Sequence, residues 1–441
     1  MLVSRMMRRV SNYRSVGRAV FLCGVIAAGV FLLRFGPHGI TRPGGFRAAA
    51  PARDSSSLFA AFAEESQPKQ AGGDIIPLRQ VADPYPVFNG IAIDPVNNVV
   101  AMSDVNRKSL LSYDRPLDSS KGDITPPRRQ VFGPLTNVGF VAGILLDPQR
   151  REILAINNDI EDTMIVLPYD AGGNAAPSRI LSIPHQAWGV AMSRAHEQIA
   201  ITVELQQAVV IYRRDARNVE APVRNIRGPQ SGLADPHGIF WDDRHNEIGV
   251  ANHGNFRGLI KDVGAGCVPG GASESRTGDS KDGEAEGGAV LPPSITTYSG
   301  DAKGDAKPLR TIQGEKTRLD FPMGLGDDPE HDEFAVANNG DNSILVFSRT
   351  ASGDTAPVRI LAGPKTGINR PMGVAIDSVN NEIWVSNFGD HTALVFDRNA
   401  SGDAAPKRII RTAPAGTPSP GFGNPQTVAY DSKREQILVP N

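Results

Sequence analysis

The sequence predicts an all-β fold assembled from repeated four-stranded units. Two phrases recur along its 441 residues. The first, Gly-Asp-x-x-Pro-x-Arg with looser copies, ends at seven arginines: Arg79, Arg128, Arg179, Arg224, Arg310, Arg359 and Arg408. The second, for example PMGVAIDSVNNEIWVSN from Pro371, also occurs seven times. Successive arginines lie 49, 51, 45, 86, 49 and 49 residues apart, so one unit takes about 49 residues.

Each unit divides into four short strands. The second phrase holds two apolar runs separated by a polar turn, as in a β-hairpin, and a third alternating run such as SILVFSR follows it. Ser-Gly-Asp then supplies a turn. Pro-x-Arg begins a fourth strand, where proline fits a strand start or a sheet edge. Four strands in about 49 residues are typical of a β-propeller blade.

The two ends of the repeat region predict how the ring closes. The last unit stops at Asn441 after two strands, and the first outer strand, PLRQV near Arg79, has no inner strands before it. We expect residues 427–441 and 76–81 to share one composite blade, so that N- and C-terminal strands close the ring. The repeat count predicts seven blades, with six as the alternative.

Composition predicts three further segments. Basic residues followed by 15 uncharged residues, Ala19 to Leu33, indicate a signal peptide or an N-terminal membrane anchor in residues 1–35. Residues 36–56 are expected to be a linker, and residues 57–441 the propeller. An insert at about 258–292, rich in Gly, Ser and charge, predicts a disordered loop. We therefore expect an exported protein, periplasmic or extracellular, or anchored to the cytoplasmic membrane by its N-terminal segment.

Charge and cysteine content exclude several classes of protein. With 46 basic and 48 acidic residues, the chain has no bulk field that favours nucleic acid. The two cysteines, Cys23 and Cys267, exclude a disulfide framework and a cysteine-rich metal site. No nucleotide-binding, zinc-protease or nucleophile-elbow motif occurs, so no cofactor is evident. We expect a monomer.

The stretch PMGVAIDSVNNEIWVSNFGDHTALVFDR resembles NHL-repeat proteins and the neighbouring YVTN-type and lactonase-like propellers. The carrying features are Pro-x-Gly-Val-Ala-Ile-Asp, a turn, and then Val-x-Asn. The resemblance covers about residues 70–441 and implies a β-propeller, often with six blades. Such families include binding scaffolds, sensor ectodomains, lactonases and lyases. Lactonase-like members hold a divalent ion with a Glu/Asn/Asp set, for which this chain offers no matching glutamate.

Loops around one mouth of the channel are expected to carry any ligand site. His237, His253 and His391 could bind a divalent metal if they converge. The full set of expected binding residues is His237, Asn252, His253, Asn338, Asp341, Asn387, Asp390 and His391. The alternative is that the Asn and Gly residues of these loops only form turns. No catalytic residue is assigned.

Two functions remain open. An enzyme should concentrate non-repeating polar residues at one point of the ring, whereas here the polar loop residues mostly follow the repeat. This favours a binding scaffold for a protein, peptide or glycan partner. The alternative is a hydrolase or lyase at the channel mouth, with or without a metal. The repeated Asp and Arg are expected to be structural, and an Asp–Arg pair between neighbouring strands is one hypothesis.

Overall fold

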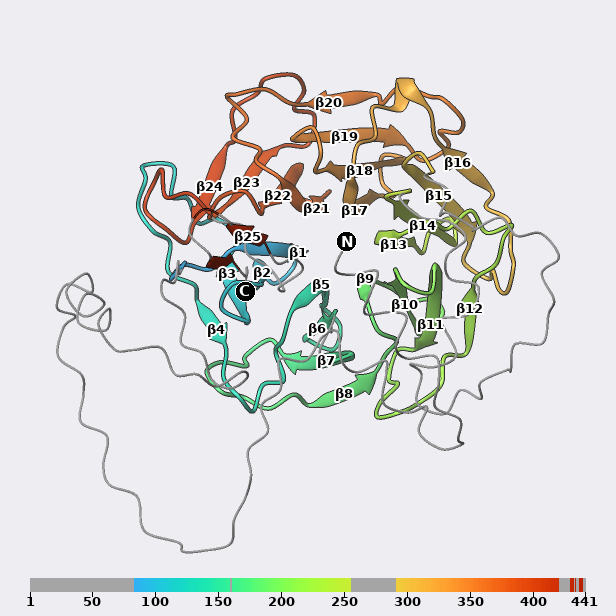
Figure 1. Cartoon of the computed structure of the whole chain (residues 1–441), viewed down its shortest axis with the longest axis horizontal. Helices are drawn as coiled ribbons and strands as arrows, with labels where there is room; N and C mark the ends of the chain where they lie inside the picture. The colour runs from blue at the N-terminus through green and yellow to red at the C-terminus, as the bar shows by residue number, and fades with distance from the viewer. Residues whose placement is uncertain are drawn as a thin grey trace, which may run out of the picture. The chain divides into compact units, whose positions relative to one another are not determined.

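The computed structural model describes residues 83–158, 161–254, 291–419, 429–431, 433 and 436–438. Within these ranges, six antiparallel four-stranded sheets surround a central channel as the blades of a β-propeller (Figure 1). The first strand of each blade is innermost and the fourth is outermost. The expected signal or anchor segment, the linker and nearly all of the insert lie outside the described residues.

The strands of the blades follow one another in chain order. Blades one to three comprise β1 (Phe88–Asp94), β2 (Val99–Asp104), β3 (Ser109–Asp114), β4 (Arg129–Val131); β5 (Val141–Asp147), β6 (Glu152–Asn157), β7 (Thr163–Pro168), β8 (Arg179–Ser182); and β9 (Ala187–Ser193), β10 (Gln198–Val203), β11 (Ala208–Arg213), β12 (Arg224–Ile226). Blades four to six comprise β13 (Pro236–Asp242), β14 (Glu247–Asn252), β15 (Ser294–Ser299), β16 (Arg310–Ile312); β17 (Pro322–Asp328), β18 (Glu333–Asn338), β19 (Ser343–Ser348), β20 (Arg359–Leu361); and β21 (Pro371–Asp377), β22 (Glu382–Asn387), β23 (Thr392–Asp397), β24 (Arg408–Arg411). A 3-10 turn, η3 (Glu315–Thr317), and a hairpin of β25 (Ala429–Asp431) and β26 (Gln436–Leu438) complete the described elements.

The second repeated phrase forms the inner hairpin of each blade. In blade six Pro371 lies opposite Asn387 and Asp377 opposite Glu382. The Asp377 side chain closes the turn between the strands, because it accepts hydrogen bonds from the backbone N–H (2.9 Å) and the side-chain amide (2.7 Å) of Asn380. The aspartate that ends the first apolar run is therefore a turn residue, which gives the structural role expected for it a physical form.

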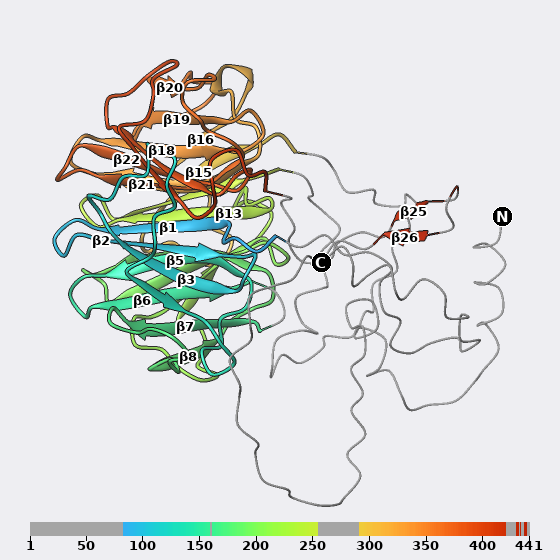
Figure 2. The same cartoon turned by 90° about the vertical axis from the view of Figure 1, so that its left-hand side faces the viewer.

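The hydrophobic core consists of six apolar layers, each between two neighbouring blades. The innermost strands of adjacent blades lie side by side, as β1 and β5 do in Figure 2. The layer between blades six and one includes Phe88 and Met102 from one side and Trp384 and Val395 from the other, all fully buried. Blade one therefore packs directly on blade six.

The ring has six blades, so the alternative count is confirmed and the count of seven is wrong. The ring closes where β1 meets β21 and β22, and the apolar layer between them leaves no room for another sheet. Among the described strands, β25 and β26 pair only with each other, as a two-stranded sheet. Residues 76–81, its expected partner, lie outside the described residues. The repeat count was too high because it included incomplete units at both ends.

The first repeated phrase fastens each blade to the one before it. Gly353, in the turn of blade five, forms a parallel bridge with Ile312 at the outer edge of blade four. The following Asp354 accepts a 2.7 Å hydrogen bond from the backbone N–H of Lys316. Equivalent bridges occur at four other blade junctions. The fourth strand is therefore protected mainly because the next blade covers it, in addition to its proline.

In four blades the arginine that opens the fourth strand pairs with a glutamate of its own blade. Arg359 donates to both carboxylate oxygens of Glu333 at 2.7 Å. Arg408 does the same to Glu382 at 2.8 Å. Blades two and four contain the equivalent pairs Arg179–Glu152 and Arg310–Glu247.

A second arginine, placed just after the third strand, joins neighbouring blades. Arg398 of blade six lies 3.4 Å from Asp328 and 3.0 Å from Glu333 of blade five. Arg115 of blade one lies 2.9 Å from Glu382 of blade six, across the closure. The expected pair between the repeated Asp and the repeated Arg is therefore not what these blades show: the repeated Arg359 and Arg408 pair with glutamates, and Asp328 instead meets Arg398, which lies outside the repeated phrase.

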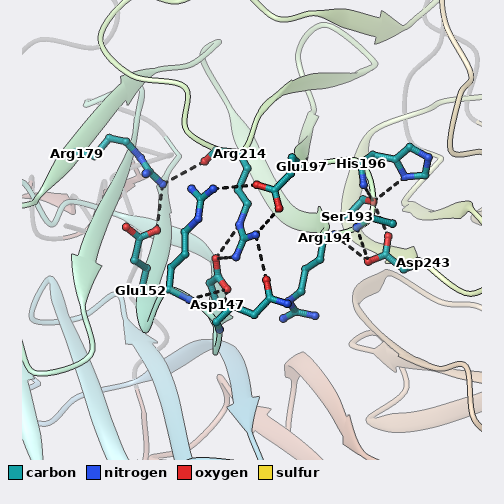
Figure 3. A network of polar contacts seen from close by, with 12 residues as sticks. Asp147, Glu152, Arg179, Ser193, Arg194, His196, Glu197, Arg214 and Asp243 are labelled. Atoms are coloured by element: carbon teal, nitrogen blue, oxygen red, sulfur yellow. Dashed lines mark hydrogen bonds and ion pairs between the residues drawn. The ribbon is translucent and has the colours of Figure 1, made fainter.

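Two consecutive junctions differ in their polar contacts (Figure 3). Between blades two and three, Arg214 bonds the fully buried Asp147 and, at 2.7 Å, Glu197. Between blades three and four, Ser193 occupies the aspartate position and Asp243 approaches from the other side. Asp243 accepts hydrogen bonds from Ser193 Oγ (2.5 Å) and from the backbone N–H of Arg194 (2.9 Å). At this junction a carboxylate of the following blade replaces the usual ion pair.

We expect the Arg–Glu pairs to make the propeller sensitive to acid. The hydrogen bond from Arg359, opposed by burial, lowers the pKa of Glu333. Burial would raise the pKa of Glu382, but its hydrogen bond with Arg408 outweighs this and lowers it. A carboxyl group with a lowered folded-state pKa stabilises the fold above its unfolded value, about 4.5 here, and loses that contribution as pH falls through the folded value. Urea unfolding should show the free energy of unfolding decreasing below about pH 4.5.

The variant Glu333→Gln is the control for this pH dependence. It cannot titrate, so its free energy of unfolding should fall less steeply below about pH 4.5 than that of the wild type. Equal slopes for the two proteins would contradict the assignment.

Candidate functional site

The central channel is narrow. Three successive residues from the first strand of every blade line it, such as His237, Gly238 and Ile239 of β13. Its cavity volume is about 90 Å³, against roughly 300 Å³ or more for sites that hold organic ligands. The channel accommodates water or a small ion, so the candidate site lies at its mouth.

A glycine in each first strand makes the channel narrow. In blade four the α-carbon of Gly238 faces the carbonyl oxygen of Met323 in blade five, and an added Cβ would overlap that oxygen. Gly143 has the same relation to the carbonyl oxygen of Trp188. The glycine of the Pro-x-Gly phrase therefore permits close contact between the backbones of adjacent blades.

The asparagines expected to bind a ligand make hydrogen bonds within their own loops. Asn252, Asn338 and Asn387 end second strands and are fully buried. Each side-chain oxygen accepts a backbone N–H from the loop that enters the first strand, at 3.1, 2.7 and 3.1 Å. Their amide groups donate to the same loops or to nearby Ser and Thr hydroxyls. These bonds support the turn alternative, while a role in binding stays a prediction.

The two expected aspartates are also engaged in turns. Asp341 accepts a hydrogen bond from the side chain of Asn338 at 2.6 Å, and Asp390 accepts one from the Thr392 hydroxyl at 2.5 Å. Burial raises the pKa of Asp390 despite these hydrogen bonds. Neither carboxylate lies with the histidine pair of blade four.

His391 does not meet the other two histidines. Its Nδ1 lies 2.9 Å from the carbonyl oxygen of Pro86, and its Nε2 lies 3.4 Å from Asp83. Tyr85 packs against it edge-on, with ring centroids 5.7 Å apart. Thr412 donates a second hydrogen bond, 2.7 Å long, to Pro86. Blade six thus holds the segment that leads into β1.

His237 and His253, two of the three histidines whose convergence the sequence left open, lie together, and Asp235 joins them. The two imidazole rings are stacked, with centroids 3.6 Å apart and planes 19° apart. His237 Nδ1 lies 3.5 Å from Asp235 Oδ1, and His253 Nδ1 lies 3.5 Å from Asp235 Oδ2. Among the described residues, these two histidines and Asp235 form a group of potential ligands whose arrangement could hold a metal ion.

Both rings are almost fully buried, which affects their charge. Burial, reinforced by the neighbouring His253, lowers the pKa of His237 to about 3. The His237 ring is therefore neutral near pH 7. A neutral imidazole has a lone pair with which it can bind a metal or accept a proton.

Aromatic rings form a continuous arc through this cluster across blades two to five. Ring centroids are 6.2 Å apart for Phe140 and Trp188, 4.3 Å for Trp188 and His237, and 4.1 Å for His253 and Phe321. Phe321 is 43% exposed, although it is a large apolar residue. Its φ of 52° holds it in the left-handed region, as a loop residue just before a first strand. We call these five rings the aromatic arc.

Sequence reasoning missed Asp235, Phe140 and Phe321. All three directly precede a first strand, at a position where the repeat has no fixed residue. Their chemistry differs from blade to blade, so a search for repetition passes over them. The signal that could have found them is this departure from the repeat beside His237 and Trp188.

Comparisons with known proteins do not assign the chain to a family. A scan against family models and a search of curated proteins both give no match. One similar solved structure is that of a nidogen/laminin complex, at 12% identity, 74% coverage of this chain, 93% of the other and a TM-score of 0.44. Another is hydrazine synthase of Kuenenia stuttgartiensis, at 10% identity, 83% and 98% coverage and a TM-score of 0.45. Similarity this distant carries no argument about function.

The resemblance noted from sequence is supported only as far as the architecture. The β-propeller is confirmed, whereas membership of the NHL-repeat or lactonase-like families stays a prediction. Within the described ranges, no helical segment reaches the length and apolarity that a bilayer span needs.

Proposed function

We propose that the chain is an exported, monomeric binding scaffold whose channel mouth holds a peptide segment of a partner protein. The observation that carries this proposal is the aromatic arc, which ends in the exposed ring of Phe321. Aromatic side chains with few rotatable bonds supply most of the binding energy in many protein interfaces. His237 and His253 are buried beneath the surface, whereas Phe140 and Trp188 are partly exposed and Phe321 is exposed. These three rings belong to blades two, three and five, a span suited to an extended chain.

Polar groups beside the arc could orient such a segment. Glu204 accepts a 2.6 Å hydrogen bond from the indole N–H of Trp188, which fixes that ring. The small channel and the internal hydrogen bonds of the loop asparagines favour binding over chemistry. The N-terminal apolar segment supports export, which fractionation of cells and detection of the full-length chain would test.

The binding proposal is tested with the full-length protein and a phage-displayed library of random peptides. Peptides enriched on the wild type should bind Phe321→Ala at least about 10-fold more weakly, because truncating an interface aromatic typically costs more than about 1.4 kcal/mol. Val379→Ala is the matched control. Val379 is also apolar and exposed, at 72%, but lies in a turn at the other end of blade six.

Three outcomes would count against the proposal. Equal affinity of Phe321→Ala and wild type would place binding elsewhere, and selection of glycans instead of peptides on an array would change the partner class. The hydrolase or lyase alternative rests on the cluster of Asp235, His237 and His253. It would be favoured by turnover of a lactone or ester that His253→Gln abolishes and Phe321→Ala leaves intact.

A further inference from the structure

We infer that Asp235, His237 and His253 form a binding site for one divalent transition-metal ion, with Zn²⁺ as the best match. The site lies at the channel mouth of blade four. It goes beyond the proposed partner binding and does not depend on it.

The three side chains lie within reach of one tetrahedral ion, although the two stacked imidazole rings must first turn so that their lone pairs converge. Zinc lies about 2.0–2.2 Å from nitrogen and carboxylate ligands, so two ligands of a tetrahedron are about 3.4 Å apart. Each imidazole Nδ1 lies 3.5 Å from a carboxylate oxygen of Asp235, and His237 Nδ1 also lies 3.1 Å from the backbone carbonyl oxygen of Asp235, a contact that an ion would replace. All the ligand atoms lie within 4.8 Å of one another. Two imidazoles and one carboxylate are a ligand set that zinc accepts, with the fourth position open.

Counting hydrogen atoms on His253 gives an independent argument. Its Nε2 lies 2.8 Å from the sulfur of Met323, and its Nδ1 faces the carboxylate of Asp235. A thioether and an ionised carboxylate only accept hydrogen bonds, whereas a neutral imidazole has a single N–H. In a neutral ring one nitrogen would therefore place its lone pair against another acceptor, a conflict that either a second proton or a metal ion at that nitrogen removes. A metal ion at Nδ1 removes this conflict and leaves the N–H of Nε2 to the sulfur.

The backbone holds the ligands in place before any ion binds. The N–H of His253 donates a 3.0 Å hydrogen bond to the carbonyl oxygen of Asp235. Asn252 accepts the N–H of Ala234 at 3.1 Å, which ties the same two loops together. Since the loops are already joined, little conformational entropy is lost on binding. The Asp235 side chain is 16% exposed, which gives an ion a route from solvent.

The test is calorimetric titration of the full-length, chelator-treated protein with Zn²⁺, and with Co²⁺ for its absorption spectrum. We expect one ion per chain and a tetrahedral Co²⁺ spectrum. Asp235→Asn and His253→Gln should each weaken binding at least about 10-fold. His245→Gln is the matched control. His245 of blade four also lies beside two carboxylates, that of Asp242 in its own blade and that of Asp332 in blade five. Its affinity should equal that of the wild type.

Two results would overturn the site. One is the absence of stoichiometric uptake by the wild type, which would mean that hydrogen atoms alone satisfy the cluster. The other is unchanged affinity in the double variant Asp235→Asn/His253→Gln. Thermal unfolding without metal checks that each variant is folded. If His253→Gln is not, Asp235→Asn decides the test alone, because its partly exposed carboxylate is replaced by a side chain of the same shape.

Discussion

Replacing Gly238 by alanine is expected to prevent the ring from closing normally and to lower the free energy of unfolding by more than about 3 kcal/mol. The new Cβ would overlap the carbonyl oxygen of Met323 in the next blade. That oxygen belongs to the backbone of an innermost strand, so no side-chain rotation relieves the overlap. The strand must shift, and in a closed ring the shift passes to every other blade.

The matched control for this variant is Gly172→Ala. Gly172 lies in an outer turn, and the atom nearest to its added Cβ is the carbonyl oxygen of Gln130, 4.0 Å away. Its free energy of unfolding should change by less than about 1 kcal/mol. Urea denaturation of both variants, with soluble yield as a second measure, decides the matter. Similar midpoints for the two would show that the inner strands can separate without cost.

Replacing Arg214 by methionine is expected to lower the free energy of unfolding by about 3–5 kcal/mol. The Arg214 side chain is only 3% exposed and its partner Asp147 is fully buried, on the neighbouring blade. Removing the guanidinium leaves the Asp147 carboxylate buried without its main counter-charge, and Glu197 loses a 2.7 Å contact. The cost therefore comes mainly from the charge that stays behind.

The adjacent residue supplies the control for Arg214. Arg213 also pairs with a carboxylate, Glu220 at 2.8 Å, but its side chain is 56% exposed. Arg213→Met should change stability by less than about 1 kcal/mol, because solvent screens exposed pairs. Adding Asp147→Asn to Arg214→Met should recover part of the lost stability. Equal losses for the two single variants would contradict the buried pair.

The repeated phrases allowed the blade, but not the number of blades, to be predicted from sequence. Local periodicity determines where Pro371 begins a strand and where Asp377 ends it. The number of blades depends on where β1 finds an apolar surface, which Trp384 and Ile410 provide on blade six. That contact joins residues nearly 300 positions apart, and no local pattern contains it.

The candidate site was predicted in part for a similar reason. His237 and His253 belong to loops of a single blade, so their convergence follows from the hairpin that joins them. His391 lies two blades further on and meets the segment around Pro86 instead. Asp235 and Phe321 were not predicted, because the residue that directly precedes a first strand differs from blade to blade. A repeat pattern identifies only residues that recur.

The contacts that fix the segment Asp83–Pro86 to the ring have a mechanical consequence. Tension on the chain preceding Asp83 reaches a segment that two blades hold. Asn106 of blade one donates to the carbonyl oxygens of Asp83 and Tyr85, and His391 and Thr412 of blade six contact that of Pro86. A pull from the N-terminal side would therefore load blades one and six together, at the junction that closes the ring.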